Sequence, residues 1–352
     1  MQPNMKDLYS DYLIAQNKHA TATGLSDILL GEISHDKVTR FLNGKLMGSK
    51  DLWNEIKADV RHNENKDNGY LALDDMIAEK PYSDENEIIC WHYSNAKNRV
   101  LKGINLITAM IRYGDACIPV GYEAIKKDVS YDDPKTGKKR RRASIGKNEM
   151  FRNLVRQAVL NQVKFKYVLS DSWFSSNDNM NLIHNELKKQ FIMGLKANRS
   201  IALTEKDKLS GQYEKLGSVS LEDGTPINVY LKGILFPVQV MKKVFKNEDG
   251  SEGVLYLVTN DLSINGEQIF ESYQKRWCIE EYHKSVKQNA SFEKSPTKTL
   301  LSQLNHIFCS LLAFCKLERL KLRTATNHFA LKYKLILRSN QIALQEWKKM
   351  AC

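Results

Sequence analysis

The stretch YQKRWCIEEYHKSVK, residues 273–287, gathers a phenol, a guanidinium, adjacent carboxylates and an ammonium in one helix-forming segment. Its pattern predicts a single helix over residues 264–288, with Ser263 as the N-cap. Such a helix either presents a solvated charged face or lines a site that binds charged groups. The angular positions of its side chains help to separate these two interpretations.

An α-helix turns by about 100° per residue, so each side chain of this segment can be placed around the helix axis. The three charged residues Arg276, Glu280 and Lys287 then share one stripe. This stripe lies within about 60° of Tyr273 and excludes Glu281. Glu280 and Lys287 are two turns apart, so a local ion pair does not explain their common face. A phosphate backbone with a metal ion beside Glu280 would explain it, and a structural charged face is the alternative.

The composition of the chain favours a polyanionic partner. Among its 352 residues, 53 are Lys or Arg and 41 are Asp or Glu, which gives a formal net charge of +12. Nucleic acid is the commonest partner of such a basic protein. Hydrophobic residues make up 42% of the chain, which is enough to bury a core.

The cysteine pattern and the apolar segments indicate a cytoplasmic protein without a membrane partner. The six cysteines form no CxxC pair, as is usual for reduced thiols. The first residues, MQPNMKDLYSD, show no signal-peptide pattern. The longest near-apolar stretch, residues 307–315, is too short to span a bilayer.

The first part of the chain, residues 1–65, reads as several short helices. In one of them Ser34 is the expected N-cap and Gly44 ends the helix. Lys37 and Arg40 lie off its apolar stripe. This basic face predicts a helix-turn-helix-like DNA-binding domain, and the alternative is a plain helical cap on the main domain.

The rest of the chain divides into three further segments. Residues 66–199 hold a meander of strands followed by strands that alternate with helices, which implies parallel pairing. Residues 200–262 form a β-rich insertion, and residues 263–352 are mostly helical. These patterns predict an α/β fold, in which a mixed sheet is flanked by helices.

Two apolar strand patterns are each followed by acids. The strand over residues 71–73 is expected to stop at Asp74 and Asp75, and the strand over residues 167–169 to stop at Asp171. An acid beside a sheet core is costly unless something neutralises it, although an isolated Asp is more often a cap or turn residue. Two divalent metal ions, roughly 3.5–4 Å apart, would neutralise such acids and Glu280 together.

A dense basic run lies in an expected loop over residues 134–144. We expect the run to contact the DNA backbone, although a solvated loop is the alternative. Its members are Lys138, Lys139, Arg140, Arg141 and Arg142.

The order of two strand acids, a β-rich insertion and a helix Glu resembles the DDE transposases of bacterial insertion sequences, which have an RNase H-like fold. The signature Y-(2)-R-(3)-E-(6)-K of their YREK group, the IS-four family, fits Tyr273, Arg276, Glu280 and Lys287 without a gap. VLSDSWFSS around Asp171 is similar to the second-aspartate segment of that family. The resemblance extends over residues 70–315.

The resemblance implies that Asp74, Asp171 and Glu280 bind two Mg²⁺ ions, for which Mn²⁺ can substitute. It also implies that Arg276 and Lys287 hold DNA phosphates. Tyr273 would then pack against a phosphate or hydrogen-bond to one. Family members often have Asp-x-Thr at the first acid, whereas this chain has Asp74-Asp75-Met76. Asp74 is favoured as the first ligand, and Asp75 is the alternative.

The implied function is cut-and-paste transposition. The enzyme would cleave double-stranded DNA at the terminal inverted repeats and join the freed 3′-hydroxyl to target DNA, as a homodimer on DNA. Two alternatives remain open. One is an RNase H-like nuclease without strand transfer, and the other is an inactive, transposase-derived DNA-binding protein.

Overall fold

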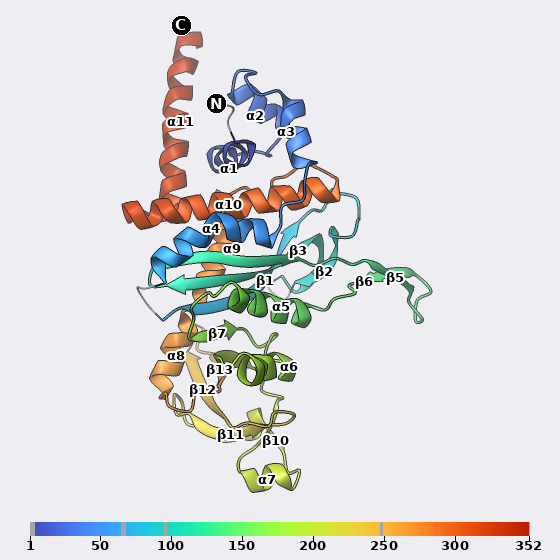
Figure 1. Ribbon diagram of the computed structural model, residues 1–352, viewed down its shortest axis with the longest axis vertical. Helices are drawn as coiled ribbons and strands as arrows, with labels where there is room; N and C mark the ends of the chain where they lie inside the picture. The colour runs from blue at the N-terminus through green and yellow to red at the C-terminus, as the bar shows by residue number, and fades with distance from the viewer. Residues whose placement is uncertain (1–3, 65–67, 95–96, 247–248, 352) are drawn as a thin grey trace.

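A twisted mixed sheet forms the centre of the protein and extends to its lower end in Figure 1. The computed structural model describes residues 4–64, 68–94, 97–246 and 249–351, so the boundary expected at 65/66 lies outside the described residues. The strands of the sheet are, in chain order, β1 (Tyr70–Glu79), β2 (Cys90–Ser94), β3 (Arg99–Tyr113), β4 (Ala116–Ala124), β7 (Tyr167–Ser170), β8 (Gln190–Leu195), β9 (Ser200–Ala202), β10 (Glu214–Lys215), β11 (Ile227–Leu231), β12 (Val238–Lys246) and β13 (Glu252–Thr259).

The pairing of the central strands confirms the expected fold class. Strands β1, β3 and β4 form an antiparallel meander, and β2 pairs with the other end of β3. Strand β1 pairs in parallel with β7, and β7 pairs in parallel with β8. Three antiparallel strands followed by two parallel strands on the other side of β1 form the RNase H-like sheet.

Helices cover this sheet and pack against it through their apolar faces. Helices α4 and α10 pack on β4, α5 packs on β3 and β4, and α9 packs on β1 and β3. The helices are α1 (Met5–Ala15), α2 (Ala22–Ile28), α3 (His35–Leu42), α4 (Ser49–Asn63), α5 (Lys147–Leu160), α6 (Asn177–Asn181), α7 (Glu205–Leu209), α8 (Gly266–Gln274), α9 (Trp277–Asn289), α10 (Leu300–Thr324) and α11 (His328–Ala351).

The segment 200–262 contains β-strands, as its pattern predicts, and these strands join the central sheet. Strand β13 pairs antiparallel with β8, with Thr259 opposite Ile192. Strands β12, β11, β9 and β10 continue outward from β13. The segment therefore lengthens the sheet on the side of β8.

The expectation that the first strand stops at its two acids is wrong. Strand β1 continues to Glu79 and stays paired with β3 as far as Gly103. Met76 and Ala78 are buried, so the alternation of buried positions persists beyond the acids. Asp74 and Asp75 consequently lie in the middle of a strand.

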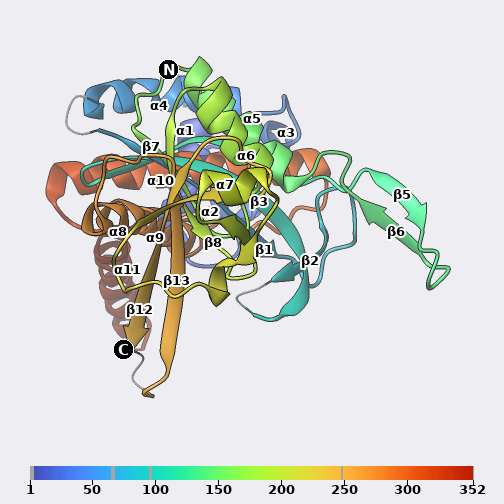
Figure 2. The same ribbon diagram turned by 90° about the horizontal axis from the view of Figure 1, so that it is seen from below.

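The expected basic loop over residues 134–144 is instead part of a two-stranded hairpin. Strand β5 (Val129–Asp132) pairs antiparallel with β6 (Lys139–Arg142). Figure 2 shows this β5–β6 hairpin projecting away from the rest of the protein. Strong β pairing outside the core was not expected from such a charged sequence.

The expected single helix over 264–288 is wrong in two details. The helix is divided into α8 and α9, because Arg276 N bonds to the Tyr273 oxygen at 2.9 Å and Ile279 N bonds to the Arg276 oxygen at 3.0 Å. In each of these bonds the donor lies three residues after the acceptor, so the backbone at the junction has 3₁₀ geometry instead of α-helical geometry. The N-cap of α8 is Asn265, since Ser263 instead bonds to Asp261.

Helix α10 lies in the core of the protein. It is long and apolar enough to cross a membrane by length and composition, but 83% of its most apolar window is buried inside the protein. The five cysteines among the described residues are free and buried, and Cys352 lies outside the described residues. Ser34 caps α3 as its pattern predicts.

Candidate active site

Three carboxylates from distant parts of the chain line one cavity of about 920 Å³. Asp74 and Asp171 each lie two residues beyond the register pair Ala72 and Leu169 of the parallel strands β1 and β7. Because those strands are neighbours and parallel, the two acids lie side by side, at the level where β7 has just ended and β1 continues. Glu280 joins them from α9, which packs on β1.

Arg276 links two of these acids. Its Nη1 donates to Asp74 Oδ2 and to Glu280 Oε1, each at 3.2 Å. The bond to Glu280 is a local pair one turn along the helix, and the bond to Asp74 crosses to β1. The guanidinium therefore neutralises negative charge that would otherwise repel within the cavity.

The Asp74 carboxyl lies where negative charge is disfavoured. Burial raises its pKa to about 8, with a further contribution from the nearby Asp171 carboxylate, while Arg276 acts in the opposite direction. Burial also raises the pKa of Asp171. Two neighbouring acids with raised pKa values indicate a site at which a bound cation would stabilise the ionised carboxylates.

A tight turn after β7 orients Asp171. Its Oδ1 accepts from the Trp173 nitrogen at 3.0 Å and from the Phe174 nitrogen at 3.4 Å. Gly194 of β8 permits this turn to approach, since a Cβ there would lie 2.9 Å from the Ser172 nitrogen and 3.2 Å from the hydroxyl oxygen of Tyr273. Glycine is therefore required where β8, the turn and α8 meet.

Asp75 also borders the cavity but has different partners. Its Oδ2 accepts from Lys147 Nζ and from Asn105 Nδ2, both at 2.8 Å. Asp74, in contrast, is held by Arg276, which also binds Glu280. The geometry places Asp74, more than Asp75, with the acid of α9.

The other signature residues lie around these acids in different ways. The Tyr273 ring is 9% exposed, and the Arg276 guanidinium carbon lies 5.6 Å from its centre. Lys287 borders the cavity, but its Nζ donates to the Ile77 oxygen at 2.7 Å and pairs with Glu293 at 3.1 Å. Arg276 thus contacts two of the acids with the Tyr273 ring beside it, and Lys287 is tied to β1.

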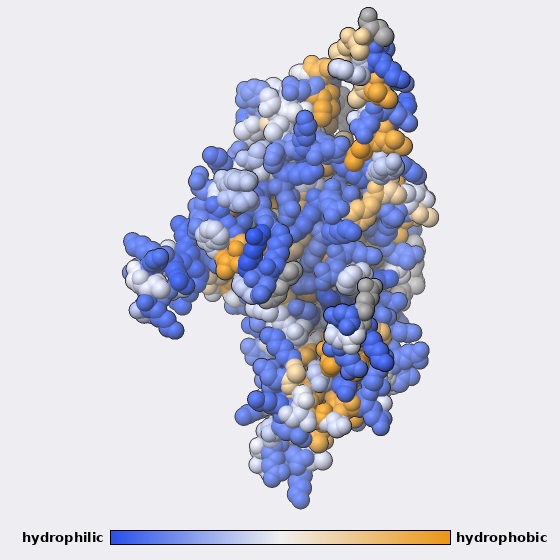
Figure 3. Space-filling model, turned by 180° about the vertical axis from the view of Figure 1, so that it is seen from behind, coloured by the Kyte–Doolittle hydropathy of each residue, from blue (hydrophilic) through white to orange (hydrophobic). Residues whose placement is uncertain are grey.

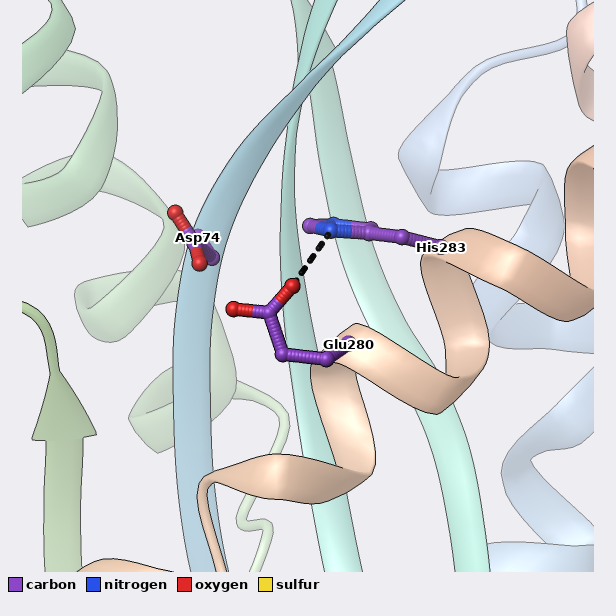
Figure 4. Close-up of side chains that lie close together, drawn as sticks. All are labelled: Asp74, Glu280 and His283. Atoms are coloured by element: carbon purple, nitrogen blue, oxygen red, sulfur yellow. Dashed lines mark ion pairs between the residues drawn. The ribbon is translucent and has the colours of Figure 1, made fainter. Parts of the chain in front are cut away.

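His283 belongs to the same site and was missed by the sequence interpretation. One ligand atom each from Asp74, Glu280 and His283 lie within 4.8 Å of one another, and Figure 4 shows the imidazole beside the Glu280 carboxylate. Burial lowers the pKa of His283 to about 3, so the ring is neutral. Its position three residues after Glu280 places it on the same helix face, which is the signal that would have identified it.

These residues fit a divalent metal ion. Asp74, Asp171 and Glu280 supply hard oxygen donors on one cavity wall, and such donors are preferred by Mg²⁺ and Mn²⁺. A negative charge on Asp74 is disfavoured there, first because burial raises its pKa and then because the Asp171 carboxylate repels it. A cation bound there would relieve that repulsion.

The expected DNA-binding basic residues lie away from the acids. Lys139–Arg142 form β6 of the β5–β6 hairpin and are exposed, and Arg140 pairs with Asp133. A groove of about 740 Å³ borders the hairpin and shares Trp91 and Lys127 with the acid cavity. The basic run that adjoins this groove is Lys138, Lys139, Arg140 and Arg141.

Lys37 and Arg40 form a separate basic group on α3, which lies near the upper end of the molecule in Figure 1; Arg40 is exposed and Lys37 is half-buried. Val38 and Leu42 of the same helix are buried. Neither basic residue borders the acid cavity. The structure therefore separates this group from both the carboxylates and the β5–β6 hairpin.

Comparisons with known proteins assign the chain to a family. Residues 6–217 match the family model described as DDE superfamily endonuclease, and residues 138–315 match the model described as transposase DDE domain. Among solved structures, one similar chain comes from the Drosophila P element transposase strand transfer complex, with a TM-score of 0.27 and 14% identity. The match covers 54% of this chain and 37% of that chain, and so loose an overlap adds nothing to the family models. No curated protein matches.

Proposed function

Because the chain belongs to the DDE superfamily endonucleases and carries a transposase DDE domain, we propose that it is an insertion-sequence transposase of the bacterial YREK group, the IS-four family. It would cleave the terminal inverted repeats and join the freed 3′-hydroxyl to target DNA, in the cytoplasm. The observation that carries this proposal is the convergence of Asp74, Asp171 and Glu280 on one cavity.

In this proposal the three carboxylates hold two Mg²⁺ ions. Such ions activate a water or a 3′-hydroxyl and stabilise the leaving oxygen. The chain contributes the positions of the ligands. The turn after β7 orients Asp171, β1 carries Asp74, and α9 brings Glu280 across the cavity. No covalent protein–DNA intermediate is required.

Arg276 would supply positive charge to a bound phosphate, and Tyr273 would hold the Arg276 guanidinium in position. Tyr273 would not act as a nucleophile. Burial raises the pKa of Tyr273, so its phenolate is disfavoured. The ring lies against the Arg276 guanidinium and limits how that group turns. Arg276 can then exchange a carboxylate for a phosphate oxygen without leaving the site.

We propose that DNA follows the groove from the β5–β6 hairpin to the acid cavity. The two cavities share Trp91 and Lys127, and the exposed cations of β6 lie at the outer end. A two-stranded β-ribbon is narrow enough for a DNA groove, and its cations add salt-dependent affinity. Double-stranded DNA is thus the proposed partner.

We also propose a homodimer, formed through α11. This helix projects from the body in Figure 1, and hydrophobic side chains gather along it in Figure 3. Tyr333, Leu337, Leu344 and Trp347 are exposed at spacings that place them on one side of the helix, with Asn340 among them. A second copy fits this stripe, because an Asn within an apolar seam pairs with its own equivalent.

Sedimentation of the full chain tests the dimer. Leu344→Lys with Trp347→Lys should convert a dimer into a monomer, because charges would enter the apolar seam. Lys349→Glu, on the opposite side of α11, is the matched control and should leave the mass unchanged. A dimer that persists in the double variant would contradict this interface.

The catalytic proposal is tested by removing one acid at a time. Asp171→Ala and Glu280→Ala should each abolish strand cleavage while binding to the terminal repeats stays largely intact. Glu281→Ala is the matched control, since Glu281 is exposed on the same helix. Retained cleavage by Asp171→Ala or Glu280→Ala would overturn the assignment.

A second assay separates a transposase from a nuclease of the same fold. Precut terminal repeats with a free 3′-hydroxyl should be joined to target DNA in the presence of Mg²⁺. Cleavage without joining would support the nuclease, and binding without metal-dependent cleavage would support an inactive, transposase-derived protein. Both outcomes would be compared with Glu280→Ala as a blank.

A further inference from the structure

The imidazole of His283 has a position that the three-carboxylate scheme does not use. It lies one turn beyond Glu280 on α9, and its Nδ1 is 3.9 Å from Glu280 Oε2. Asp74 on β1 completes the group, since one ligand atom of each residue lies within 4.8 Å of the others. Figure 4 shows the ring edge-on beside the Glu280 carboxylate, on the side away from Asp74.

The polar atoms of this ring lack the partners that a structural histidine has. The Nε2 atom is buried and makes no hydrogen bond with any described residue. The Nδ1 atom is farther from Glu280 Oε2 than a hydrogen bond extends. By contrast, the buried His306 bonds Tyr9 through Nδ1 and the Ser291 oxygen through Nε2, both at 3.0 Å. Buried polar groups nearly always form hydrogen bonds, so the unbonded nitrogens of His283 indicate that a ligand binds there.

We propose that His283 supplies a nitrogen ligand to the divalent cation held between Asp74 and Glu280. This inference rests on the metal site of the proposed function and makes one of its two positions a mixed site with two carboxylates and one imidazole. The His283 side chain is 12% exposed and lies one helical turn from Glu280. A small rotation of the side chain would therefore bring one of its nitrogens onto the ion that Glu280 binds. Asp171, outside this group, would serve the other position.

The mixed donor set changes which ion binds best. Mg²⁺ prefers oxygen ligands and keeps much of its water, whereas imidazole nitrogen suits first-row transition metals. The position between Asp74 and Glu280 should therefore favour Mn²⁺ over Mg²⁺. The same preference would be absent if His283 only filled space.

His92 offers a matched control in the same cavity. It borders the acid cavity, and its Nε2 is also buried without a hydrogen bond to a described residue. It does not belong to the group of mutually close ligand atoms formed by Asp74, Glu280 and His283. A comparison of the two histidines therefore separates metal ligation from the removal of a buried imidazole.

The test is electron spin-echo spectroscopy of Mn²⁺ bound to the full chain without DNA. Wild-type protein should show coupling between the bound Mn²⁺ and a ¹⁴N nucleus. The coupling should disappear in His283→Gln and persist in His92→Gln. Mn²⁺ affinity should fall by at least about tenfold in His283→Gln, while Mg²⁺ affinity, measured by competition, should change much less.

Several outcomes would overturn the inference. Bound Mn²⁺ without ¹⁴N coupling in wild type would do so, and this measurement requires no variant to fold. Coupling that survives in folded His283→Gln, or no Mn²⁺ binding to wild type, would do so equally. If Asp171→Ala and Glu280→Ala still abolish cleavage in those cases, the inference about His283 fails and the proposed function stands.

Discussion

Two charged regions of the molecule differ in how their charges are held. In the acid cavity the side chains are desolvated and tied to one another, so that the side chain of Asp74 is 15% exposed and bound to Arg276. In the β5–β6 hairpin the cations project into solvent, and the side chain of Arg140 is 54% exposed. The same kind of group, an ionisable side chain, is thus placed in two very different environments.

The difference predicts two separable functions. Desolvated charges shift each other's pKa values and fix geometry, which suits bond cleavage. Solvated charges interact weakly with their neighbours and are free to bind phosphates, which suits affinity. Changes in the cavity should therefore alter reaction rate, and changes in the β5–β6 hairpin should alter binding.

The largest expected effect separates the two adjacent acids of β1. Asp74→Asn should slow cleavage by about a thousandfold or more, because it removes a carboxylate ligand of the proposed metal site. Asp75→Asn should cost much less, since Asp75 is held by Lys147 and Asn105. The measurement is single-turnover nicking of a terminal-repeat duplex, with DNA affinity measured in parallel. If Asp75→Asn has the larger effect, the assignment within this pair is reversed.

The sequence could predict the features that depend on local periodicity. The apolar strand before Asp171 and its parallel partner follow from such patterns, and both are present. The helical phase placed Tyr273, Arg276, Glu280 and Lys287 on one stripe. In spite of the junction between α8 and α9, Arg276 contacts both Tyr273 and Glu280, and Glu280 and Lys287 border the cavity. Local pattern was sufficient wherever one element sets the relative positions.

Features that depend on distant contacts could not be read from the sequence. The bond from Arg276 to Asp74 joins residues 202 positions apart. Strand β1 continues past its acids because β3 stays paired with it, and no local signal marks that extension. The β5–β6 hairpin likewise depends on a cross-strand pairing within a sequence of low β propensity.

The next effect concerns the hairpin itself. Replacement of Lys138, Lys139, Arg140, Arg141 and Arg142 by Gln should weaken DNA binding by at least about a hundredfold at 0.1 M salt. The slope of log affinity against log salt should fall by about 0.9 for each lost phosphate contact. Cleavage at saturating protein should persist, because the acids are unchanged.

A matched control sharpens this test. Lys348→Gln with Lys349→Gln removes exposed charge from α11, far along the chain from the hairpin, and should leave the salt slope nearly unchanged. Equal losses in the two variants would mean that net charge, and not the hairpin, sets the affinity. Loss of cleavage at saturating protein in the hairpin variant would show that the hairpin affects the reaction rate as well as DNA binding.

A smaller effect concerns stability, and it depends on another desolvated group. Burial lowers the pKa of His306 to about 3, whereas an unfolded histidine titrates near 6.5. Below that value the unfolded chain binds the proton that the folded protein excludes, so stability is complete above pH 6.5 and falls as the pH decreases toward 3. Between pH 7 and pH 5 this one group should cost about 2 kcal/mol of unfolding free energy.

Urea unfolding at pH 7 and pH 5 measures this dependence. His306→Gln should be less stable at pH 7, because His306 bonds Tyr9 and the Ser291 oxygen, but it should show a shallower change with pH. His35→Gln is the matched control, since His35 is exposed, and its pH dependence should equal that of wild type. A steep dependence that survives in His306→Gln would assign the effect to other groups.

The smallest expected effect tests whether the contrast extends to the basic group on α3. Lys37→Ala with Arg40→Ala should weaken binding to the terminal repeats by about tenfold or less, because two side chains contribute only a few base or phosphate contacts. A DNA-reading helix predicts a loss confined to the repeat sequence, with scrambled DNA bound as before. A plain helical cap predicts no change on either DNA, and a phosphate-binding surface predicts equal losses on both. Lys57→Ala, at an exposed position on α4, is the matched control. Because Val38 and Leu42 are buried while the two cations are not, the double variant should remain folded, so a selective loss would assign sequence reading to α3.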